Sequence, residues 1–227
     1  MSFDFTDWTL VFDLDGTLVE TAPDLHAALN HTLVQKNLGP VAIETIRMMI
    51  GEGAKALIRK GLAHHGAKID ETELEEQLWP SFLNYYQKNI TRLSHAYPGC
   101  VDCLKRLTRS KAKLAVCTNK AQMLAEHVLA GVELDHYFAA TVGGDALAVK
   151  KPDGAHILET IARSGGDPKR AIMIGDSQTD ERAARDAGLP FVFVSFGYGT
   201  LSGQPYDRLR SIDHWRDMQR ALSQLAN

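Results

Sequence analysis

The stretch Thr9-Leu10-Val11-Phe12-Asp13-Leu14-Asp15-Gly16-Thr17 joins a short apolar run to two acidic residues and a glycine. The apolar run has the β-branched and aromatic composition that predicts a buried strand. In an open parallel sheet, ligands bind at the carboxyl ends of the strands, which is where the two acids lie. Gly16 permits the backbone turn that two carboxylates, two residues apart, need in order to converge on one site. The motif therefore predicts a ligand site at the end of the first strand.

The rest of the chain alternates short apolar runs with longer helical patterns. The apolar runs predict further strands at 113–117, 139–142, 171–174 and 191–194. Helical patterns lie near 100–109, 120–130, 153–164, 178–187 and 213–225. Strands that alternate with helices in this way are typical of a parallel sheet covered by helices on both faces. We therefore expect an α/β fold with a Rossmann-like parallel sheet at its centre.

The region from Thr21 to Tyr97 interrupts this alternation, because it contains several helical patterns and no convincing strand. Gly39-Pro40 and Gly51-Glu52-Gly53 indicate turns between short helices, and Pro98-Gly99 ends the region. We therefore expect an α/β core domain of residues 1–20 and 98–227, with an all-helical domain of residues 21–97 inserted after the first strand.

The composition is that of an ordinary globular protein, since 44% of the 227 residues are hydrophobic, 23% are charged and the formal net charge is -3. Acidic and basic residues are interspersed, so we expect neither nucleic acid nor a membrane as a partner. Residues 1–5 lack the features of a signal peptide, which leads us to expect a cytoplasmic protein. The Cys100-x-x-Cys103 pair has no second pair or histidine spacing that would complete a zinc site.

Further polar motifs follow the later strands. Thr118-Asn119-Lys120 comes after the second strand, Lys150-Lys151 after the third, and Asp176 with Asp180 after the fourth. A hydroxyl and N–H groups at a helix start bind phosphate oxygens, and a lysine neutralises phosphate charge. Taken singly, the threonine is more often a helix cap and the lysines are a solvated surface feature, whereas the first motif alone favours a ligand site over a plain turn. Four motifs in order at the ends of four strands favour a single phosphate site.

With these motifs the chain resembles the haloacid dehalogenase superfamily and, within it, the phosphoglycolate phosphatase group. The resemblance implies that Asp13 is the nucleophile and Asp15 the general acid and base. It also implies that Thr118 and Lys151 bind phosphate as part of the catalytic set. The implied Mg²⁺ site is formed by Asp13, the backbone carbonyl of Asp15 and Asp176. Asp180 is implied to orient these metal ligands or Lys151.

The helical insertion is similar to the cap domain of this family. Ile50-Gly51-Glu52-Gly53-Ala54 resembles the cap loop that reaches into the site, although a plain interhelical turn fits these residues equally well. The family pattern has a second proline at the position of Gly154, so this chain departs from it there. The residues expected to contact the substrate are Gly16, Thr17, Gly51, Gly53, Thr118, Asn119 and Lys151.

The resemblance implies a magnesium-dependent phosphatase, a monomer or a homodimer, that acts on a small phosphorylated metabolite, with phosphoglycolate favoured, through an aspartyl-phosphate on Asp13. A sugar phosphomutase shares the core motifs and remains an alternative, as does a catalytically inactive regulatory protein on the same fold. The dehalogenase branch lacks an acid at the position of Asp15, so the presence of Asp15 argues against a dehalogenase. A phosphonoacetaldehyde hydrolase needs a cap lysine, and Lys55 and Lys60 lie in the right region, but Asp15 would then have no role.

Overall fold

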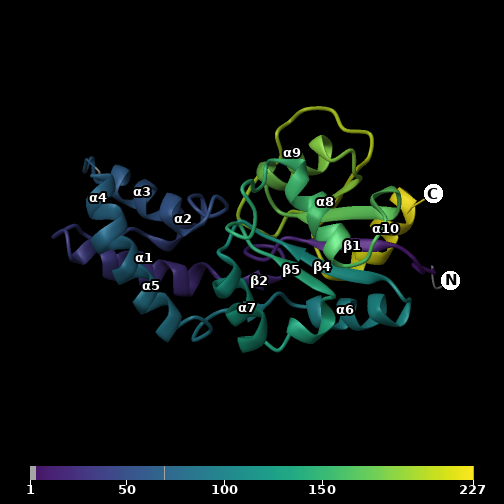
Figure 1. The fold of residues 1–227 in the computed structure, drawn as a ribbon, viewed down its shortest axis with the longest axis horizontal. Coiled ribbons are helices and arrows are strands. Elements are labelled where there is room, and N and C mark those ends of the chain that lie inside the picture. Colours follow the sequence, from purple (N-terminus) through teal and green to yellow (C-terminus); the bar gives the residue numbers. More distant parts are fainter. Residues whose placement is uncertain (1–3, 69, 227) are drawn as a thin grey trace.

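The computed structural model describes residues 4–68 and 70–226, which form an α/β part joined to a group of helices (Figure 1). The N-terminal residues 1–3, which belong to the predicted core domain, lie outside this description, as do residues 69 and 227. The central sheet has six strands in the order β5-β4-β1-β6-β7-β8, and all its pairs are parallel. The predicted α/β fold is therefore confirmed.

The strands of this sheet largely coincide with the apolar runs of the sequence. β1 lies inside the sheet, where Phe12 pairs with Val116 of β4 on one side and with Ile174 of β6 on the other. The residues that follow these three strands therefore meet at one edge. The strands are β1 (Thr9–Phe12), β4 (Lys113–Cys117), β5 (Ala140–Val142), β6 (Ala171–Gly175), β7 (Phe191–Val194) and β8 (Leu209–Ile212).

Helices cover both faces of the sheet (Figure 1). Leu10 and Phe12 of β1 pack with α6, α7 and α10, whereas Val11 packs with α8 and α9, because successive side chains of a strand point to opposite faces. The helices are α6 (Cys100–Arg109), α7 (Gln122–Gly131), α8 (Gly154–Arg163), α9 (Gln178–Asp186) and α10 (Met218–Ala226), with 3₁₀ turns at Asp135–Tyr137, Pro168–Arg170 and Trp215–Asp217.

The chain between β1 and β4 forms the separate helical group. α1 packs against α5 around Leu29, Phe82 and Tyr86, in an apolar core of its own. Leu124 of α7 joins this core, so the helical group rests on the α/β part. Its helices lie within the predicted insertion, whose limits at 21 and 97 stay a prediction. They are α1 (Ala22–Val34), α2 (Ile43–Arg47), α3 (Ala54–His64), α4 (Glu71–Glu73), a π-helical turn (Leu74–Leu78) and α5 (Trp79–Lys88).

Two short antiparallel strands, β2 (Val19–Glu20) and β3 (His95–Ala96), join the two parts. The prediction that the insertion contains no strand is therefore wrong at His95–Ala96. Two residues are too few to show the alternation by which a strand is recognised in a sequence. The pair holds the outgoing and the returning chain together at the base of the helical group.

Buried hydrogen bonds fix both connections further. Asp24, in the first turn of α1, accepts hydrogen bonds from the backbone N–H and the hydroxyl of Ser94 at 2.8 and 2.6 Å. Tyr198, which follows β7, accepts at its hydroxyl a hydrogen bond from the backbone N–H of Thr21 at 2.7 Å and donates to Glu20 at 2.9 Å. The C-terminal half of the sheet is thus tied directly to the start of the helical group.

The departure at Gly154 affects the packing of helices. Its backbone N–H donates to the Asp186 carboxylate at 2.7 Å, and a Cβ atom at this position would lie 2.5 Å from the backbone nitrogen of Ala187. The start of α8 therefore approaches the end of α9 more closely than a larger residue allows. Asp153 caps α8 by accepting a hydrogen bond from the backbone N–H of Ala155 at 2.8 Å.

The Cys-x-x-Cys pair lies in the first turn of α6. Cys100 and Cys103 are buried and free, as is Cys117 in β4. Burial is the largest cause that raises the pKa of Cys103 to about 11 and the pKa of Cys117 to about 12, so both stay protonated at neutral pH. These thiols pack as small apolar groups.

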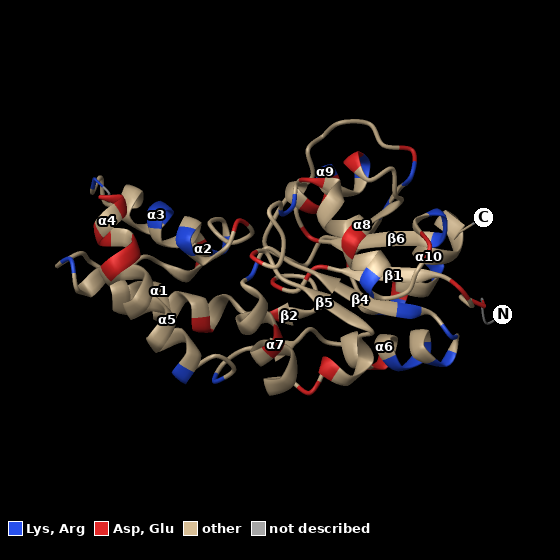
Figure 2. Ribbon diagram, in the orientation of Figure 1, with Lys and Arg blue, Asp and Glu red and all other residues tan. Residues whose placement is uncertain are grey.

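Charged residues of both signs occur in the α/β part and in the separate helical group (Figure 2). No helix among the described residues combines the length and the apolar character that a bilayer span requires.

Candidate active site

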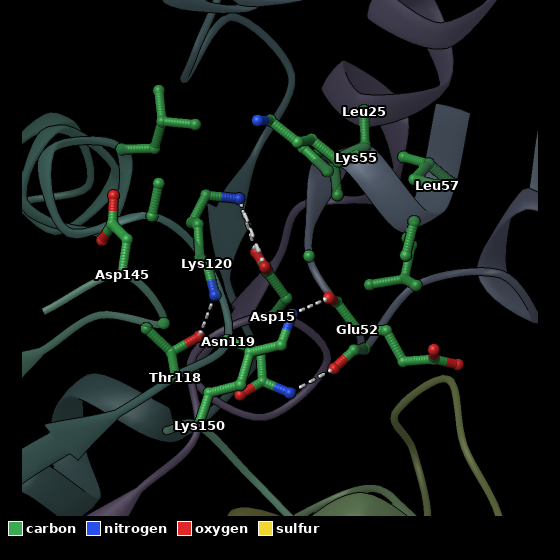
Figure 3. A pocket seen from close by; sticks show the side chains of 18 of the residues that line it. Asp15, Leu25, Glu52, Lys55, Leu57, Thr118, Asn119, Lys120, Asp145 and Lys150 are labelled. Carbon is green, nitrogen blue, oxygen red and sulfur yellow. Dashed lines mark hydrogen bonds and ion pairs between the residues drawn. The ribbon is translucent and has the colours of Figure 1, made fainter. Parts of the chain in front are cut away.

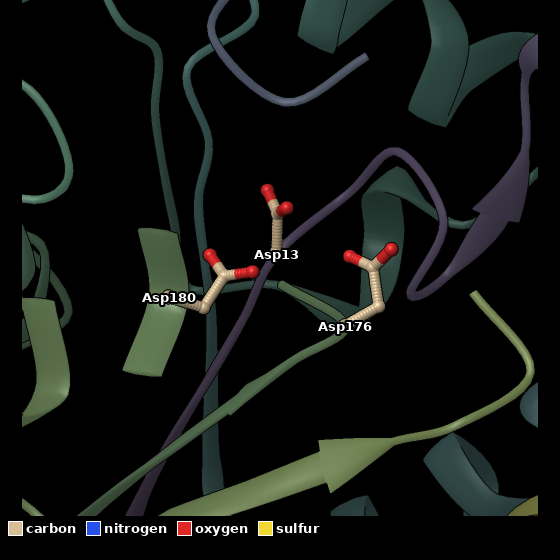
Figure 4. Close-up of side chains that lie close together, drawn as sticks. All are labelled: Asp13, Asp176 and Asp180. Carbon is tan, nitrogen blue, oxygen red and sulfur yellow. The ribbon is translucent and has the colours of Figure 1, made fainter. Parts of the chain in front are cut away.

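Three buried carboxylates converge at the carboxyl edge of the sheet (Figure 4). Asp13 follows β1, Asp176 follows β6, and Asp180 lies in the first turn of α9. Each offers one oxygen, and these oxygens all lie within 4.8 Å of one another. The parallel register of β1 and β6 brings them together, because Asp13 and Asp176 each extend one of two neighbouring strands.

The backbone around Asp176 holds its carboxylate in place. Thr17 donates its hydroxyl to one oxygen at 3.2 Å, and the backbone N–H of Tyr198 donates to the other at 2.7 Å. Gly16 has a φ of +84°, and a Cβ atom there would lie 2.4 Å from the Asp176 carboxylate. Gly16 is therefore required both by its positive φ and by the approach of Asp176.

Lys151 supplies the positive charge of this cluster. Its ammonium lies 2.6 Å from Asp180 and 2.9 Å from Asp13, and its side chain is 1% exposed. Asp180 also belongs to a capping box with Ser177, which accepts a hydrogen bond from the Asp180 backbone N–H while the carboxylate accepts from Ser177. The start of α9 thus sets the position of Asp180, and Asp180 sets that of Lys151.

Burial and like charge make the ionised carboxylates costly. Burial is the largest cause that raises the pKa of Asp13 to about 7, and the ammonium of Lys151 opposes this rise. Burial followed by the charges of Asp180 and Asp13 raises the pKa of Asp176 well above its ordinary value. A cation bound between these carboxylates would favour their ionised forms.

The donor set fits a hard divalent cation. The cluster offers carboxylate oxygens, the ligands that such cations prefer. Asp13 Oδ1 is buried and accepts no hydrogen bond of good geometry from the described residues. It forms an ion pair with the ammonium of Lys151 at 2.9 Å. This oxygen therefore retains coordination capacity. The cluster includes Asp180, and it does not include the side chain of Asp15.

Asp15 lies apart from the cluster, although it follows Asp13 by only two residues. Its carboxylate accepts a hydrogen bond from the hydroxyl of Thr21 at 2.6 Å. It also accepts hydrogen bonds from the ammonium of Lys120 at 3.0 and 3.2 Å. The prediction that the two carboxylates of the first motif converge on one site is therefore wrong for their side chains, because Thr21 and Lys120 hold Asp15 in surroundings of its own.

A cavity of about 450 Å³ opens above these residues, between the sheet and the helical group. Asp13, Asp15, Thr118 and Asn119 line it from the sheet side. The helical group contributes the loop before α3 and side chains of α1, α3 and α5, which include Leu25, Leu57, Trp79 and Tyr86. A ligand in this cavity would contact both parts of the chain.

The loop before α3 is bonded to the sheet side of the cavity (Figure 3). Asn119 donates from its amide to the carbonyl oxygen of Gly51 at 3.0 Å and to that of Lys151 at 2.9 Å. Lys150 donates from its ammonium to the carbonyl oxygen of Glu52 at 2.8 Å. Asn119 therefore links Lys151 to the loop before α3.

The predicted substrate contacts fall into two groups. Gly51, Gly53, Thr118 and Asn119 line the cavity, and Lys151 contacts Asp13 at its base. Gly16 and Thr17 instead pack against Asp176, and they do not line the cavity. Contact between any of these residues and a substrate stays a prediction.

Two residues that sequence reasoning did not select stand out in the structure. Lys120 is buried beside Asp15, whereas a lysine near a helix start is normally a surface residue. His156, in the first turn of α8, accepts a hydrogen bond from the backbone N–H of Lys151 at 3.3 Å. The sequence signals this contact with the backbone of Lys151 only through the spacing of five residues between the two.

Comparison with known proteins adds relatives to this geometry. Residues 10–194 match the sequence model of the haloacid dehalogenase-like hydrolase family. A phosphoglycolate phosphatase from Caulobacter vibrioides is 46% identical over 195 residues, which are 86% of this chain and 82% of that protein. A phosphoglycolate phosphatase from Agrobacterium fabrum is 42% identical over 188 residues, which are 83% of this chain and 80% of that protein.

A solved structure is similar over nearly the whole chain. The crystal structure of a predicted phosphoglycolate phosphatase from Haemophilus somnus superimposes with a TM-score of 0.86 at 29% identity. The match covers 95% of this chain and 97% of that chain, so both the sheet and the helical group have counterparts there.

Proposed function

The chain belongs to the haloacid dehalogenase-like hydrolase family, and we propose that within it this protein is a magnesium-dependent phosphatase that hydrolyses phosphoglycolate. Its relatives from Caulobacter vibrioides and Agrobacterium fabrum are named phosphoglycolate phosphatases, which supports this substrate. The buried carboxylates of Asp13, Asp176 and Asp180 support the metal. Hydrolysis of a phosphate monoester is the activity that this set of residues serves best.

The observation that carries the proposal is the separation of two neighbouring acids. Asp13 lies in the buried cluster beside Lys151, whereas Asp15 is held by Thr21 and Lys120 at the cavity. The two roles that phosphoryl transfer through a phosphoenzyme requires, a nucleophile and a proton donor, thus fall to different carboxylates. In this proposal Asp13 lies against the cation site, and Asp15 lies beside the leaving group.

In the proposed first step, an oxygen of Asp13 attacks phosphorus, and the bond between phosphorus and the ester oxygen breaks. Asp15 gives its proton to the departing oxygen, which leaves as an alcohol. In the second step, Asp15 takes a proton from water, the water oxygen attacks phosphorus, and the carboxylate of Asp13 is released.

Shielding of charge makes the attack possible, because the phosphate and the attacking carboxylate are both anionic. Magnesium bound by Asp13, the backbone carbonyl of Asp15 and Asp176 would supply positive charge beside the phosphate oxygens. Lys151 adds a second positive charge, and Thr118 offers a hydroxyl at the cavity wall. Asp180 keeps the ammonium of Lys151 in position.

The predicted helical domain, residues 21–97, acts in this proposal as a cap that excludes water from the cavity. The bonds from Asn119 to Gly51 and from Lys150 to Glu52 support this role, because they join the cap loop to the sheet side of the cavity. The strand pair of β2 and β3 provides the connection about which the cap would open.

A phosphate-release assay tests the proposal. The purified protein is incubated with phosphoglycolate, hexose phosphates and pyrophosphate, with Mg²⁺ or with EDTA. We expect hydrolysis that requires Mg²⁺ and prefers phosphoglycolate. Asp13→Asn protein, purified in the same way, controls for contaminating phosphatases. Full activity in EDTA, equal activity of the Asp13→Asn protein, or a preference for hexose phosphates would each refute a part of the proposal.

A further inference from the structure

Lys120 is a buried cation that the proposed mechanism does not use. Its side chain is 4% exposed, and its ammonium lies 3.0 Å from Asp15 and 4.8 Å from the ring centroid of Tyr86 in α5. It lines the cavity together with both of these residues. Lys151 already serves the phosphate, so a second buried ammonium at the proton donor requires its own explanation.

The chemistry of the substrate places a negative charge next to this ammonium. In phosphoglycolate a single CH₂ group joins the leaving oxygen to the carboxylate. A general acid lies about 2.6–3.2 Å from the oxygen that it protonates. Because Asp15 contacts that oxygen in the mechanism and Lys120 contacts Asp15, the substrate carboxylate and the Lys120 ammonium are neighbours. A lysine ammonium has three N–H donors, so Asp15 does not exhaust its capacity.

The other cations that line the cavity are committed elsewhere. Lys55 lies 2.5 Å from Glu75, and Arg59 lies 2.6 Å from Glu71, both within the helical group. Lys150 donates to the backbone carbonyl of Glu52. Among the cavity-lining residues that the structure describes, Lys120 is the cation paired with the proposed general acid.

We infer that Lys120 binds the carboxylate of the substrate and thereby makes the enzyme specific for phosphate esters with a carboxylate on the carbon beside the leaving oxygen. This inference rests on the proposed function, since it takes Asp15 as the proton donor to that oxygen. Lys120 is then a specificity residue as well as a partner of Asp15. The ammonium also makes a cation–π contact with the ring of Tyr86, which brings the cap helix α5 to the recognition site.

The test compares two esters that differ only at the recognised group. Phosphoglycolate carries a carboxylate where ethyl phosphate carries a methyl group, and the value measured is the ratio of kcat/KM for the two. Lys120→Met removes the charge and keeps the length of the side chain. Because this variant loses a charge-assisted hydrogen bond to the substrate carboxylate, the ratio should fall by about 10- to 150-fold. Lys55→Met, the matched control, removes a cavity cation that Glu75 already pairs and should leave the ratio unchanged.

Each outcome has one meaning. If kcat/KM falls equally for both esters in Lys120→Met, the lysine serves only Asp15 and the inference is overturned. If Lys55→Met lowers the ratio and Lys120→Met does not, the carboxylate is bound at the helical group, which also overturns it. Wild-type protein that hydrolyses neither ester, or shows no preference for phosphoglycolate, refutes the proposed function instead.

A wild-type comparison keeps the inference testable if Lys120→Met does not fold, which thermal unfolding will reveal. Phosphorylated 3-hydroxypropionate has one more CH₂ group between the leaving oxygen and the carboxylate. Because Lys120 contacts Asp15 directly, we expect the longer ester to have a lower kcat/KM than phosphoglycolate, by at least about 10-fold. An equal or higher value for the longer ester places the recognised carboxylate away from Lys120 and contradicts the inference.

Discussion

Replacing Asp13, the proposed nucleophile, with its neutral isostere asparagine should stabilise the metal-free protein. Asp13 is 7% exposed and lies with Asp176 and Asp180 in one cluster, so its negative charge is held at a cost. Asp13→Asn removes that charge with almost no change in shape. Loss of activity and gain of stability are therefore expected from the same substitution, as happens where a site is built for function.

The size of the effect follows from the pKa of Asp13. Burial above all raises this pKa from 3.8 to about 7, and at 1.36 kcal/mol per pKa unit the rise corresponds to about 4 kcal/mol. The folded protein holds the Asp13 proton more tightly than the unfolded chain, so ionisation costs stability between pH 4 and 7. The gain from Asp13→Asn should be near zero below pH 4, grow through this range and level off above pH 7 at about 2–4 kcal/mol.

Urea unfolding in EDTA measures this gain at pH 4, 5.5 and 7.5. Asp207→Asn, which removes one negative charge at an exposed position, is the matched control and should change stability little. Mg²⁺ should then stabilise the wild-type protein, by about 2.7 kcal/mol at 100 times its Kd, and stabilise Asp13→Asn much less. A variant that is less stable than wild type in EDTA at pH 7.5 would refute this account of the cluster.

Three further substitutions test separate parts of the site. Asp15→Asn should lower turnover of an alkyl phosphate by roughly two to four orders of magnitude, while rapid-quench measurements show a smaller loss in the first release of an acidic phenol, which departs without a proton. His156 has its pKa lowered to about 4, mainly by burial. The unfolded chain therefore binds the proton first below about pH 6.5, and stability falls toward pH 4. His156→Gln should remove up to about 3 kcal/mol of that fall between pH 7 and 4.5 in urea unfolding, and an unchanged pH dependence would contradict it. Tyr198→Phe removes the acceptor of the Thr21 N–H and one hydrogen bond of Glu20, which Tyr97 still contacts. Unfolding in urea should therefore show a loss of about 1–3 kcal/mol, and a loss below 0.5 kcal/mol would count against the link.

The sheet could be predicted from the sequence because its strands are strongly apolar. Leu10, Phe12 and Val11 are all buried, so the run around them carries a clear signal. β8 (Leu209–Ile212) was not predicted, because it is an edge strand in which Leu and Ile flank Arg and Ser and only Ile212 is buried. An edge strand that is half exposed has a composition close to that of a loop.

The acidic site was also accessible to sequence reasoning, because Asp13 and Asp176 each directly follow a strand. What the sequence did not reveal is which carboxylates share surroundings. Asp15 is two residues from Asp13, yet its partners are Thr21 and Lys120, the latter 105 residues away. That contact depends on the pairing of β1 with β4, which no local pattern encodes.

The cap side of the site was the least predictable part. The family resemblance indicated the loop at Gly51 and Gly53, but a turn between helices explains the same residues. The bonds from Asn119 and Lys150 to the backbone of this loop place it against the sheet edge, and its contact with a substrate stays a prediction. Backbone acceptors leave no signal in the sequence, since any residue type supplies them.

The central claim is that phosphate passes through the carboxylate of Asp13, and trapping the phosphoenzyme tests it most directly. Asp15→Asn protein in Mg²⁺ lacks the base for the second step, so it should accumulate phosphate when given an aryl phosphate. The protein is quenched in acid, digested and analysed by mass spectrometry, with Asp13→Asn as the negative control. We predict phosphate on the peptide that contains Asp13 and none in the control. Phosphate on another residue, or turnover of wild-type protein with no labelled peptide under any quench condition, would contradict the mechanism.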